Sequence, residues 1–333
     1  MTVPSGAVQT FAQVGIREAL SDTISNIAPT ETPFYSTICK KGTTKSRNPE
    51  WLKDTLRDPS PTNAAVEGDD TTGDTMYQPT RLKNYVQLFD EVAIVSDTAR
   101  AVETAGRQDE LKYQIAKTGK ALKRDVEMRI CGNYSAVAGN ASTAGQLGGA
   151  EAWFTTNVSR GSGGSSGGYN TGTGLATLAT DGTPRTYTET LLKAVIKSAW
   201  DAGGEPSVVM MSGSKKQTAS SFAGIASQTN DINGQNKVIV YGATDIYKSD
   251  FGQHKFVANR FVGAGTGRSA TNGLYAGLSA LVLDPSTWEV KFLQPWSVTQ
   301  LARTGHAEKR LLKAELTLCC QNEAANGVVA DLS

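Results

Sequence analysis

The feature that most constrains this chain is one long amphipathic helix, predicted from Arg107 to Gly132. At about 100° per residue, its apolar side chains fall within one arc of about 100° and form a single stripe: Leu111, Ile115, Leu122, Val126 and Ile130. Asp109 and Glu110 in the first turn and Arg129 in the last agree with the helix dipole. At 1.5 Å per residue the helix is about 39 Å long, more than twice the usual three turns. A helix this long with one apolar side predicts a spine on which smaller elements pack.

Composition limits the classes of protein that fit. The length of 333 residues suggests about two domains, and the apolar content of 39% is enough for real cores. The net charge is near +1, whereas dedicated nucleic-acid binders usually carry a strong basic excess. No apolar run is long enough for a membrane span, and the first residues lack the basic and apolar parts of a signal peptide. The four cysteines have no metal-ligand spacing and are interpreted as reduced core residues of a protein made in cytosol: Cys39, Cys131, Cys319 and Cys320.

The first 95 residues carry patterns that reach outward. In residues 1–45, interpreted as an arm, Phe34 and Tyr35 are anchors that insert either into another part of the fold or into a neighbouring chain. Residues 40–95 are basic at first and acidic later, amid prolines and glycines, so they bury little apolar area alone. We predict a long two-legged hairpin with a polar tip and a strand-like return leg over residues 85–95. A solvated surface loop and a loop ordered by another subunit fit this composition about equally well.

Three segments follow the spine. Residues 134–185 are expected to be the least ordered part, with a flexible linker over Ser159–Gly168. Residues 186–262 alternate helical and strand patterns and predict a separate α/β unit. Residues 274–333 are strand-rich, and their last strand, Arg310–Cys319, is expected to cover the apolar stripe of the spine. The chain as a whole therefore predicts an α+β fold.

No catalytic, cofactor-binding or metal-binding constellation is visible in the sequence. His254 and His306 are interpreted as surface-turn residues, because neither lies near a Ser or Cys in a strained-turn motif. The glycines of residues 159–168 lack the Lys and Ser/Thr that end a phosphate-binding loop. The glycines of residues 263–267 lack the third glycine and the following helix of a dinucleotide site. We therefore expect a chain without enzyme activity, cofactor or metal, selected for shape and contacts.

Eight short stretches, each weakly specific alone, occur in one order along the chain: Thr32–Ile38, Glu50–Trp51, Val66–Asp69, Val95–Thr98, Ala105–Leu111, Lys123–Glu127, Asp250–Gly252 and Thr304–Arg310. Together with the order arm, long loop, spine helix, insert, α/β unit and return strands, they resemble the major capsid protein of tailed double-stranded DNA bacteriophages. The resemblance covers essentially the whole chain and implies the Hong Kong 97-type fold.

The resemblance also implies a division of the chain. On this basis residues 1–45 are the N-terminal arm and 46–95 the extended loop (E-loop). Residues 96–185 form the peripheral domain with the spine helix and a flexible insert. Residues 186–277 form the axial domain around the capsomer centre, and residues 278–333 return as strands to the peripheral domain.

The function implied is self-assembly into pentamers and hexamers of an icosahedral phage head that encloses packaged double-stranded DNA. The protein would be assembled in the host bacterial cytoplasm and located in the virion. A scaffolding protein is expected as a separate chain, because no scaffolding segment precedes residue 1. A portal and a cement protein are further expected partners, with weak non-specific contact to DNA and no membrane.

Two sets of side chains are candidates for contacts. Those between subunits are Phe34, Tyr35, Lys45, Arg47, Trp51, Arg57, Glu67, Asp69, Asp70 and Asp74. The basic stripe of Lys117, Lys120 and Arg124 is a candidate for facing DNA. The sequence alone favours another interpretation of this stripe, a solvated helix face or one paired with neighbours such as Glu127.

Two other classes remain open at this point. A tail or cement protein would show mostly β repeats and no spine helix. A nucleotide-binding enzyme built on residues 186–262 would need a phosphate site, which the glycines do not provide.

Overall fold

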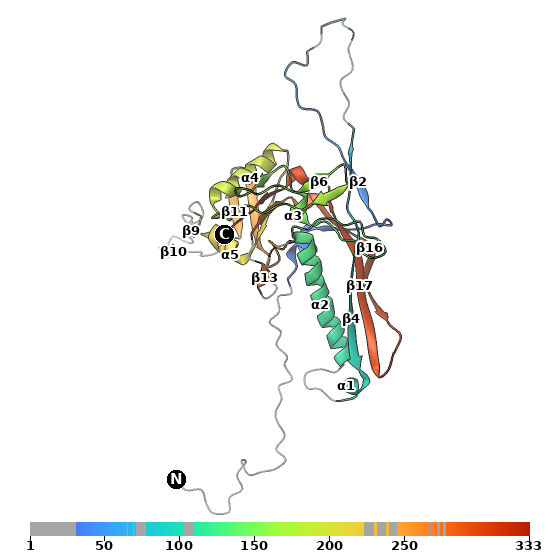
Figure 1. Cartoon of the computed structure of the whole chain (residues 1–333). Helices are drawn as coiled ribbons and strands as arrows, with labels where there is room; N and C mark the ends of the chain where they lie inside the picture. Colours follow the sequence, from blue (N-terminus) through green and yellow to red (C-terminus); the bar gives the residue numbers. More distant parts are fainter. Residues whose placement is uncertain are drawn as a thin grey trace, which may run out of the picture.

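The computed structural model describes residues 31–64, 66–68, 70, 78–102, 109–222, 230–231, 238–239, 245–266, 268, 270–271, 274–275 and 278–333. Figure 1 shows a long helix beside long strands on one side, a sheet of shorter strands with its helices on the other, and a loop that projects from the body. No helix among the described residues is both long and apolar enough to cross a membrane.

The spine is α2, Glu110–Cys131, and its N-terminus is capped by Asp109, whose carboxylate accepts the Leu111 N–H at 3.0 Å. It packs on β4 and β17 of a four-stranded sheet, in the order β1 (Lys40–Thr43), β16 (Trp288–Gln300), β17 (Ala307–Cys320) and β4 (Gln87–Ser96). Leu122, Val126 and Ile130 are buried in this layer. The prediction that the last strand covers the apolar stripe is confirmed.

Within residues 46–95, expected to be the E-loop, a short antiparallel pair encloses the projecting part, residues 54–79. The pair is β2 (Glu50–Lys53) and β3 (Thr80–Lys83), in which Lys53 lies opposite Thr80. The predicted two-legged hairpin is only partly correct. Its return leg does not pair with the first leg, because β4 lies along β17 from Gln87 to Ser96. Phe89, Ala93 and Val95 are buried beneath this strand, so its apolar alternation is satisfied by the spine helix.

The second sheet has six strands in the order β11-β12-β8-β15-β18-β5. Their bounds are β5 (Val158–Ser159), β8 (Val208–Met211), β11 (Ile246–Ser249), β12 (Gly252–Ala258), β15 (Ala280–Leu283) and β18 (Gly327–Val329). Two helices pack on it, α4 (Glu189–Asp201) against β18 and α5 (Gly213–Ser220) against β12. The α/β unit is therefore completed by strands from outside residues 186–277, because the buried strand β8 needs a partner on each side.

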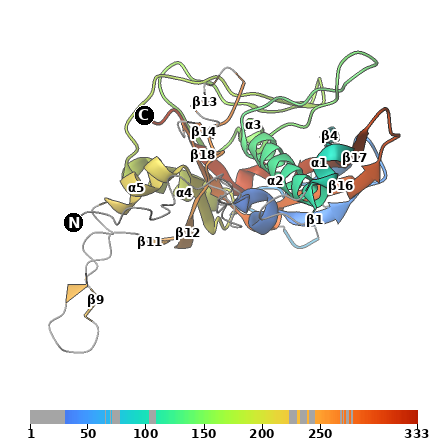
Figure 2. The ribbon, with the colours of Figure 1, turned by 90° about the horizontal axis from the view of Figure 1, so that it is seen from below.

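The segment of residues 134–185 is more fixed than the sequence predicts. It contains α3 (Ala150–Trp153), β6 (Gly168–Asn170) and β7 (Leu175–Thr177), and its loops lie on the side of the molecule away from β11 and β12 (Figure 2). The expected flexible linker is held by the Gly161 N–H, which donates to Asp331 Oδ2 at 2.8 Å, and by a bridge between Ser165 and Thr180. The flexible-linker prediction is wrong, because backbone groups of the glycine-rich stretch have fixed partners in the fold.

The remaining elements are short. They are η2 (Phe34–Ile38), α1 (Asp97–Ala101), β9 (Asn230–Asp231), β10 (Val238–Ile239), β13 (Ala270–Thr271), β14 (Leu274–Tyr275), η3 (Pro285–Thr287) and η4 (Glu323–Ala325).

Candidate assembly site

A buried carboxylate with three hydrogen-bond donors lies on the inner side of the spine. The Glu127 side chain is fully buried. Its Oε1 accepts the Phe34 N–H at 2.8 Å and the Asn259 Nδ2–H at 2.7 Å, and its Oε2 accepts the Tyr35 N–H at 2.8 Å. Burial raises the pKa of Glu127, and the three donors act in the opposite direction. We name these four residues, Glu127, Phe34, Tyr35 and Asn259, the Glu127 junction. They join the arm, the spine and the six-stranded sheet with its helices, which we call the six-stranded lobe.

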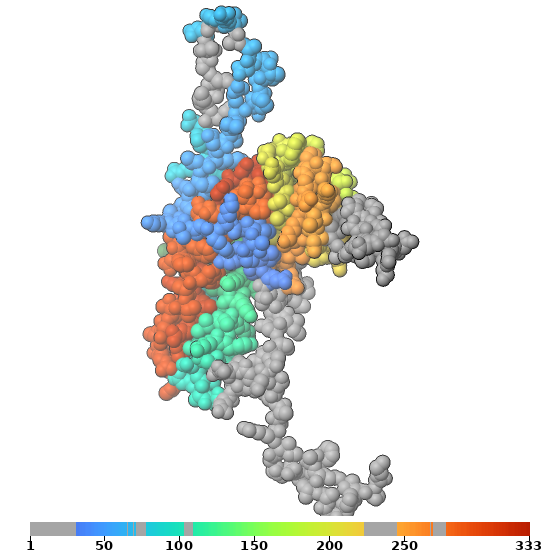
Figure 3. Space-filling view, turned by 180° about the vertical axis from the view of Figure 1, so that it is seen from behind, coloured from blue at the N-terminus to red at the C-terminus, as the bar shows by residue number. Residues whose placement is uncertain are grey.

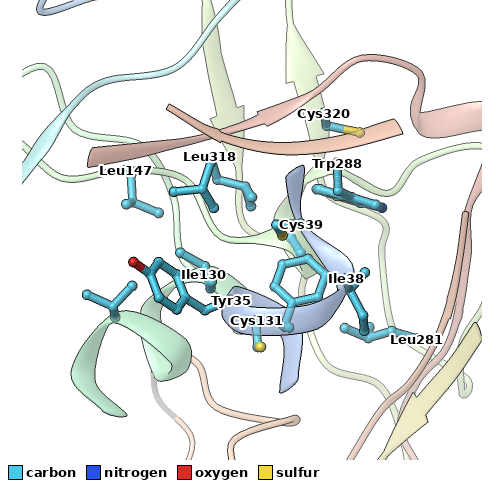
Figure 4. Packing of buried hydrophobic residues seen from close by; sticks show 14 of the residues in the cluster. Tyr35, Ile38, Cys39, Ile130, Cys131, Leu147, Leu281, Trp288, Leu318 and Cys320 are labelled. Carbon is cyan, nitrogen blue, oxygen red and sulfur yellow. The ribbon is translucent and has the colours of Figure 1, made fainter. Parts of the chain in front are cut away.

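The aromatic anchors of the arm pack beside this junction. Phe34 is fully buried, with its ring 5.6 Å from that of Trp288 in an edge contact. Tyr35 accepts a hydrogen bond from Trp296 Nε1 at 2.8 Å. Figure 4 shows Tyr35, with Ile38, among residues of the spine and of the strands. Both anchors insert into their own subunit, the first of the two alternatives. Their prediction as contacts between subunits is corrected, because neither side chain is presented at the surface.

All four cysteines are buried and free, as their interpretation as core residues predicts. Burial raises the pKa of the Cys39, Cys131 and Cys320 thiols well above the ordinary value and that of Cys319 to about 12.

Trp51 fixes the base of the E-loop rather than its tip. Its indole N–H donates to the Cys320 carbonyl at 2.8 Å, and its ring lies 5.6 Å from that of Trp153. Trp51 is only half-buried, so part of its surface remains available.

The charged candidates from Lys45 to Asp74 lie at the surface wherever the structure describes them. Lys45, Arg47, Arg57, Glu67 and Asp70 are exposed. Asp69 and Asp74 lie outside the described residues.

Apolar side chains are also exposed along the loop. Leu52 is 68% exposed, Leu56 96% and Val66 75%. Figure 3 shows the loop standing away from the body of the subunit. A group of apolar side chains this exposed along one segment is typical of an interaction surface.

The basic stripe lies on the outer side of the spine. Lys117 and Lys120 are exposed, whereas Arg124 is half-buried with its guanidinium 5.9 Å from the centre of the Phe261 ring. Glu127, the expected partner of Arg124, points into the core, so the pairing predicted from sequence is wrong. Two further exposed lysines of the same helix, Lys112 and Lys123, were missed by the sequence analysis.

A second buried charged group, also missed from sequence, ties the insert to the six-stranded lobe. Arg268 makes a two-pronged contact with Glu151 at 2.8 Å for both nitrogen–oxygen pairs and also pairs with Asp181. Glu151 is fully buried and accepts the Ser279 hydroxyl at 2.9 Å. Such a contact is among the stronger polar interactions in proteins.

The two histidines have different environments. His306 is exposed in a turn, as predicted. His254 is buried, with Nδ1 2.7 Å from the Pro206 carbonyl oxygen and Nε2 2.7 Å from Ser249 Oγ. The surface-turn prediction for His254 is wrong, because it lies in β12, where alternation turns it inward. Burial lowers the pKa of His254.

This burial predicts a pH dependence of stability. Since the folded-state pKa of His254 is lowered, the unfolded chain binds the extra proton first as the pH falls through about 6.5. The stabilisation is fully present above that pH and is lost progressively as the pH falls from there through the lowered folded-state pKa. Urea unfolding at pH 7.5 and 5.5 measures the loss. We expect His254→Gln to reduce it and His306→Gln to leave it unchanged, and equal losses in both variants would contradict the assignment.

Comparisons with known proteins agree with this architecture. A family model described as SU10 major capsid protein matches residues 3–333. The major capsid protein of Escherichia phage Phieco32 is 26% identical over 357 residues, which cover 96% of this chain and 95% of that protein. A Gordonia phage Cozz structure has a TM-score of 0.61 at 14% identity, with 100% of this chain and 98% of the other covered. The cyanophage A-1(L) capsid asymmetric unit gives 0.62 at 12% identity, with 98% and 99% covered.

At these identities the solved structures show a shared fold, the Hong Kong 97-type capsid fold of the α+β class that the resemblance implies. The function follows from the family match, which extends over almost the entire chain. The protein belongs to the SU10 major capsid protein family and is a structural protein of the virion capsid.

Proposed function

We propose that this capsid protein assembles into pentamers and hexamers of an icosahedral head around packaged double-stranded DNA, with the E-loop as an arm between neighbours. The observation that carries the proposal is the projecting loop, whose side chains Leu52, Leu56 and Val66 are exposed in the isolated subunit. Covering them with a neighbour removes apolar surface from water, which favours association.

The face of the four-stranded sheet that points away from α2 is a suitable acceptor for this arm. Leu88 is 53% exposed and Ile94 57% exposed on β4, on the side away from α2. A groove of about 430 Å³ lies beside Leu88, and its lining holds Asp90 and Glu315 together with Arg47 of the same subunit. The E-loop brings Lys and Arg side chains near its apolar ones, so charge and apolar surface are both complementary.

The remaining parts of the proposal rest on the family. We propose a separate scaffolding protein, a portal and a cement protein as partners, and assembly in the cytoplasm of a host bacterium. We also propose that the chain has no catalytic activity of its own, which the structural role of the family supports. The domain boundaries follow the same analogy, with residues 186–277 nearest the capsomer centre.

Reversal of the acidic charges in the E-loop tests its role. We expect Asp69→Lys with Asp70→Lys to reduce the yield of closed shells strongly, because the introduced lysines would be repelled by the basic partners that the acidic side chains meet. The free energy of unfolding of the subunit should change by no more than about 0.5 kcal/mol, the usual range for a substitution such as that of the exposed Asp70. Electron microscopy counts the shells, and urea unfolding of the unassembled subunit measures stability.

The control moves two exposed acids outside the loop, Asp250→Lys with Glu205→Lys. Both double variants change the net charge by the same amount. Normal shells from the E-loop variant, or equal losses in both variants, would show that charge in this loop does not direct assembly.

A further inference from the structure

The outer face of the spine helix carries a cluster of exposed lysines. Lys112, Lys117, Lys120 and Lys123 are all exposed and lie within an arc of about 140° around the helix. Within the part of the chain that the structure describes, none of the four forms an ion pair with a carboxylate. We name these four side chains the lysine face.

This cluster is locally unfavourable for the isolated subunit. Lys117 and Lys120, and likewise Lys120 and Lys123, are three residues apart, so like charges lie next to each other on the helix surface. Lys41, from β1, adds charge at one end: burial lowers its pKa most, the positive charge of Lys123 acts in the same direction, and Glu127 opposes both. In a chain with a net charge near +1, this concentration requires a local explanation.

The residues between the lysines indicate the kind of partner. Among the lysines, Ala116 is exposed and Tyr113 is half-buried, and no large hydrophobic side chain of α2 is exposed, so the face presents no exposed apolar anchor. Protein interfaces depend on such anchors at their centre. Contacts to nucleic-acid phosphates require only positive charge, and the ammonium group of lysine supplies it without a fixed direction.

We propose that the lysine face binds the phosphate backbone of double-stranded DNA weakly and without sequence preference. The inference rests on the proposed role of the shell as a DNA container, and it names the surface that meets the DNA. Four cations per subunit make the contact salt-sensitive rather than tight, with log K falling by about 3.6 per tenfold rise in salt. A lining of this strength allows DNA to move during packaging and still offsets part of its charge.

The test uses unassembled, full-length subunits and a short labelled DNA duplex, with binding followed by fluorescence anisotropy between 50 and 200 mM salt. We expect Lys117→Glu with Lys120→Glu to weaken binding at least tenfold and to reduce the salt slope by about 1.8. The matched control is Lys248→Glu with Lys255→Glu, two exposed lysines on β11 and β12 with the same change in net charge. The control should bind like the unaltered protein.

Unchanged DNA binding in the Lys117/Lys120 variant, or an equal loss in the control, would overturn the proposal. So would poly-glutamate binding to this face at a salt concentration where DNA does not bind, which would indicate an acidic protein partner. Circular dichroism checks folding, and the four Lys→Gln substitutions give a second variant without added acidic charge. Shell formation by the same variants is scored separately, so a failure of DNA binding is distinguishable from a failure of the capsid function.

Discussion

Replacing Glu127 with alanine is expected to lower the free energy of unfolding of the subunit by about 3–5 kcal/mol. The reason is that three buried donors lose their acceptor at once, the N–H groups of Phe34 and Tyr35 and the amide of Asn259. Each unsatisfied buried donor costs about 1–3 kcal/mol, and relief of the buried charge offsets part of the sum. The same substitution frees the arm from the spine, so shell assembly should fail as well.

Two companion variants make the result specific. Glu127→Gln should lower the free energy of unfolding by less than Glu127→Ala, because the amide keeps one acceptor oxygen. Some loss remains, because its NH2 group then faces a donor. Asp125→Ala, two residues earlier on the exposed side of the same helix, should cost no more than about 0.5 kcal/mol. Urea unfolding of unassembled subunits measures all three. A Glu127→Ala protein as stable as the Asp125→Ala protein would refute the junction.

Shortening the E-loop is expected to abolish closed shells while leaving the subunit folded. Lys53 and Thr80 are directly opposite each other at the end of the β2–β3 pair. An Asn-Gly turn can therefore join them in place of residues 54–79, since two-residue turns of this type connect antiparallel strands without strain. Trp51 and the strands at the base keep their contacts, so the melting temperature should change by only a few degrees.

A full-length control separates loop chemistry from loop length. Leu56→Ser with Val66→Ser keeps the loop at its full length but removes two exposed apolar side chains. We expect it to assemble poorly, between the unaltered protein and the shortened one. Closed shells formed by the shortened protein in normal yield would show that subunits associate without this arm.

The sequence predicts well those elements whose signal is local. The spine helix has a clear 3.6-residue stripe, and α2 buries that stripe against the strands that follow from their own alternation. The helix α4 and the strand β8 lie where residues 186–211 predict them. The order of these elements, together with the eight short stretches that resemble a phage capsid family, implied the fold and the capsid role.

The polar centre of the fold could not be predicted in this way. Glu127 lies about 60° outside the edge of the apolar stripe, so periodicity places it at the surface. It is buried because η2 and Asn259, both far away in sequence, supply donors to its carboxylate. His254 and the glycine-rich linker were mispredicted for the same reason. Their partners, Pro206 and Asp331, are 48 and 170 residues away, and no local pattern indicates them.

We propose that this chain builds a closed shell from many copies of itself. Negative-stain electron microscopy of the purified, concentrated full-length protein is the decisive measurement. We predict closed shells, or the rings of five and six subunits from which they form. A homogeneous monomer that stays dispersed at high concentration, with or without a measurable enzymatic turnover, would contradict the account.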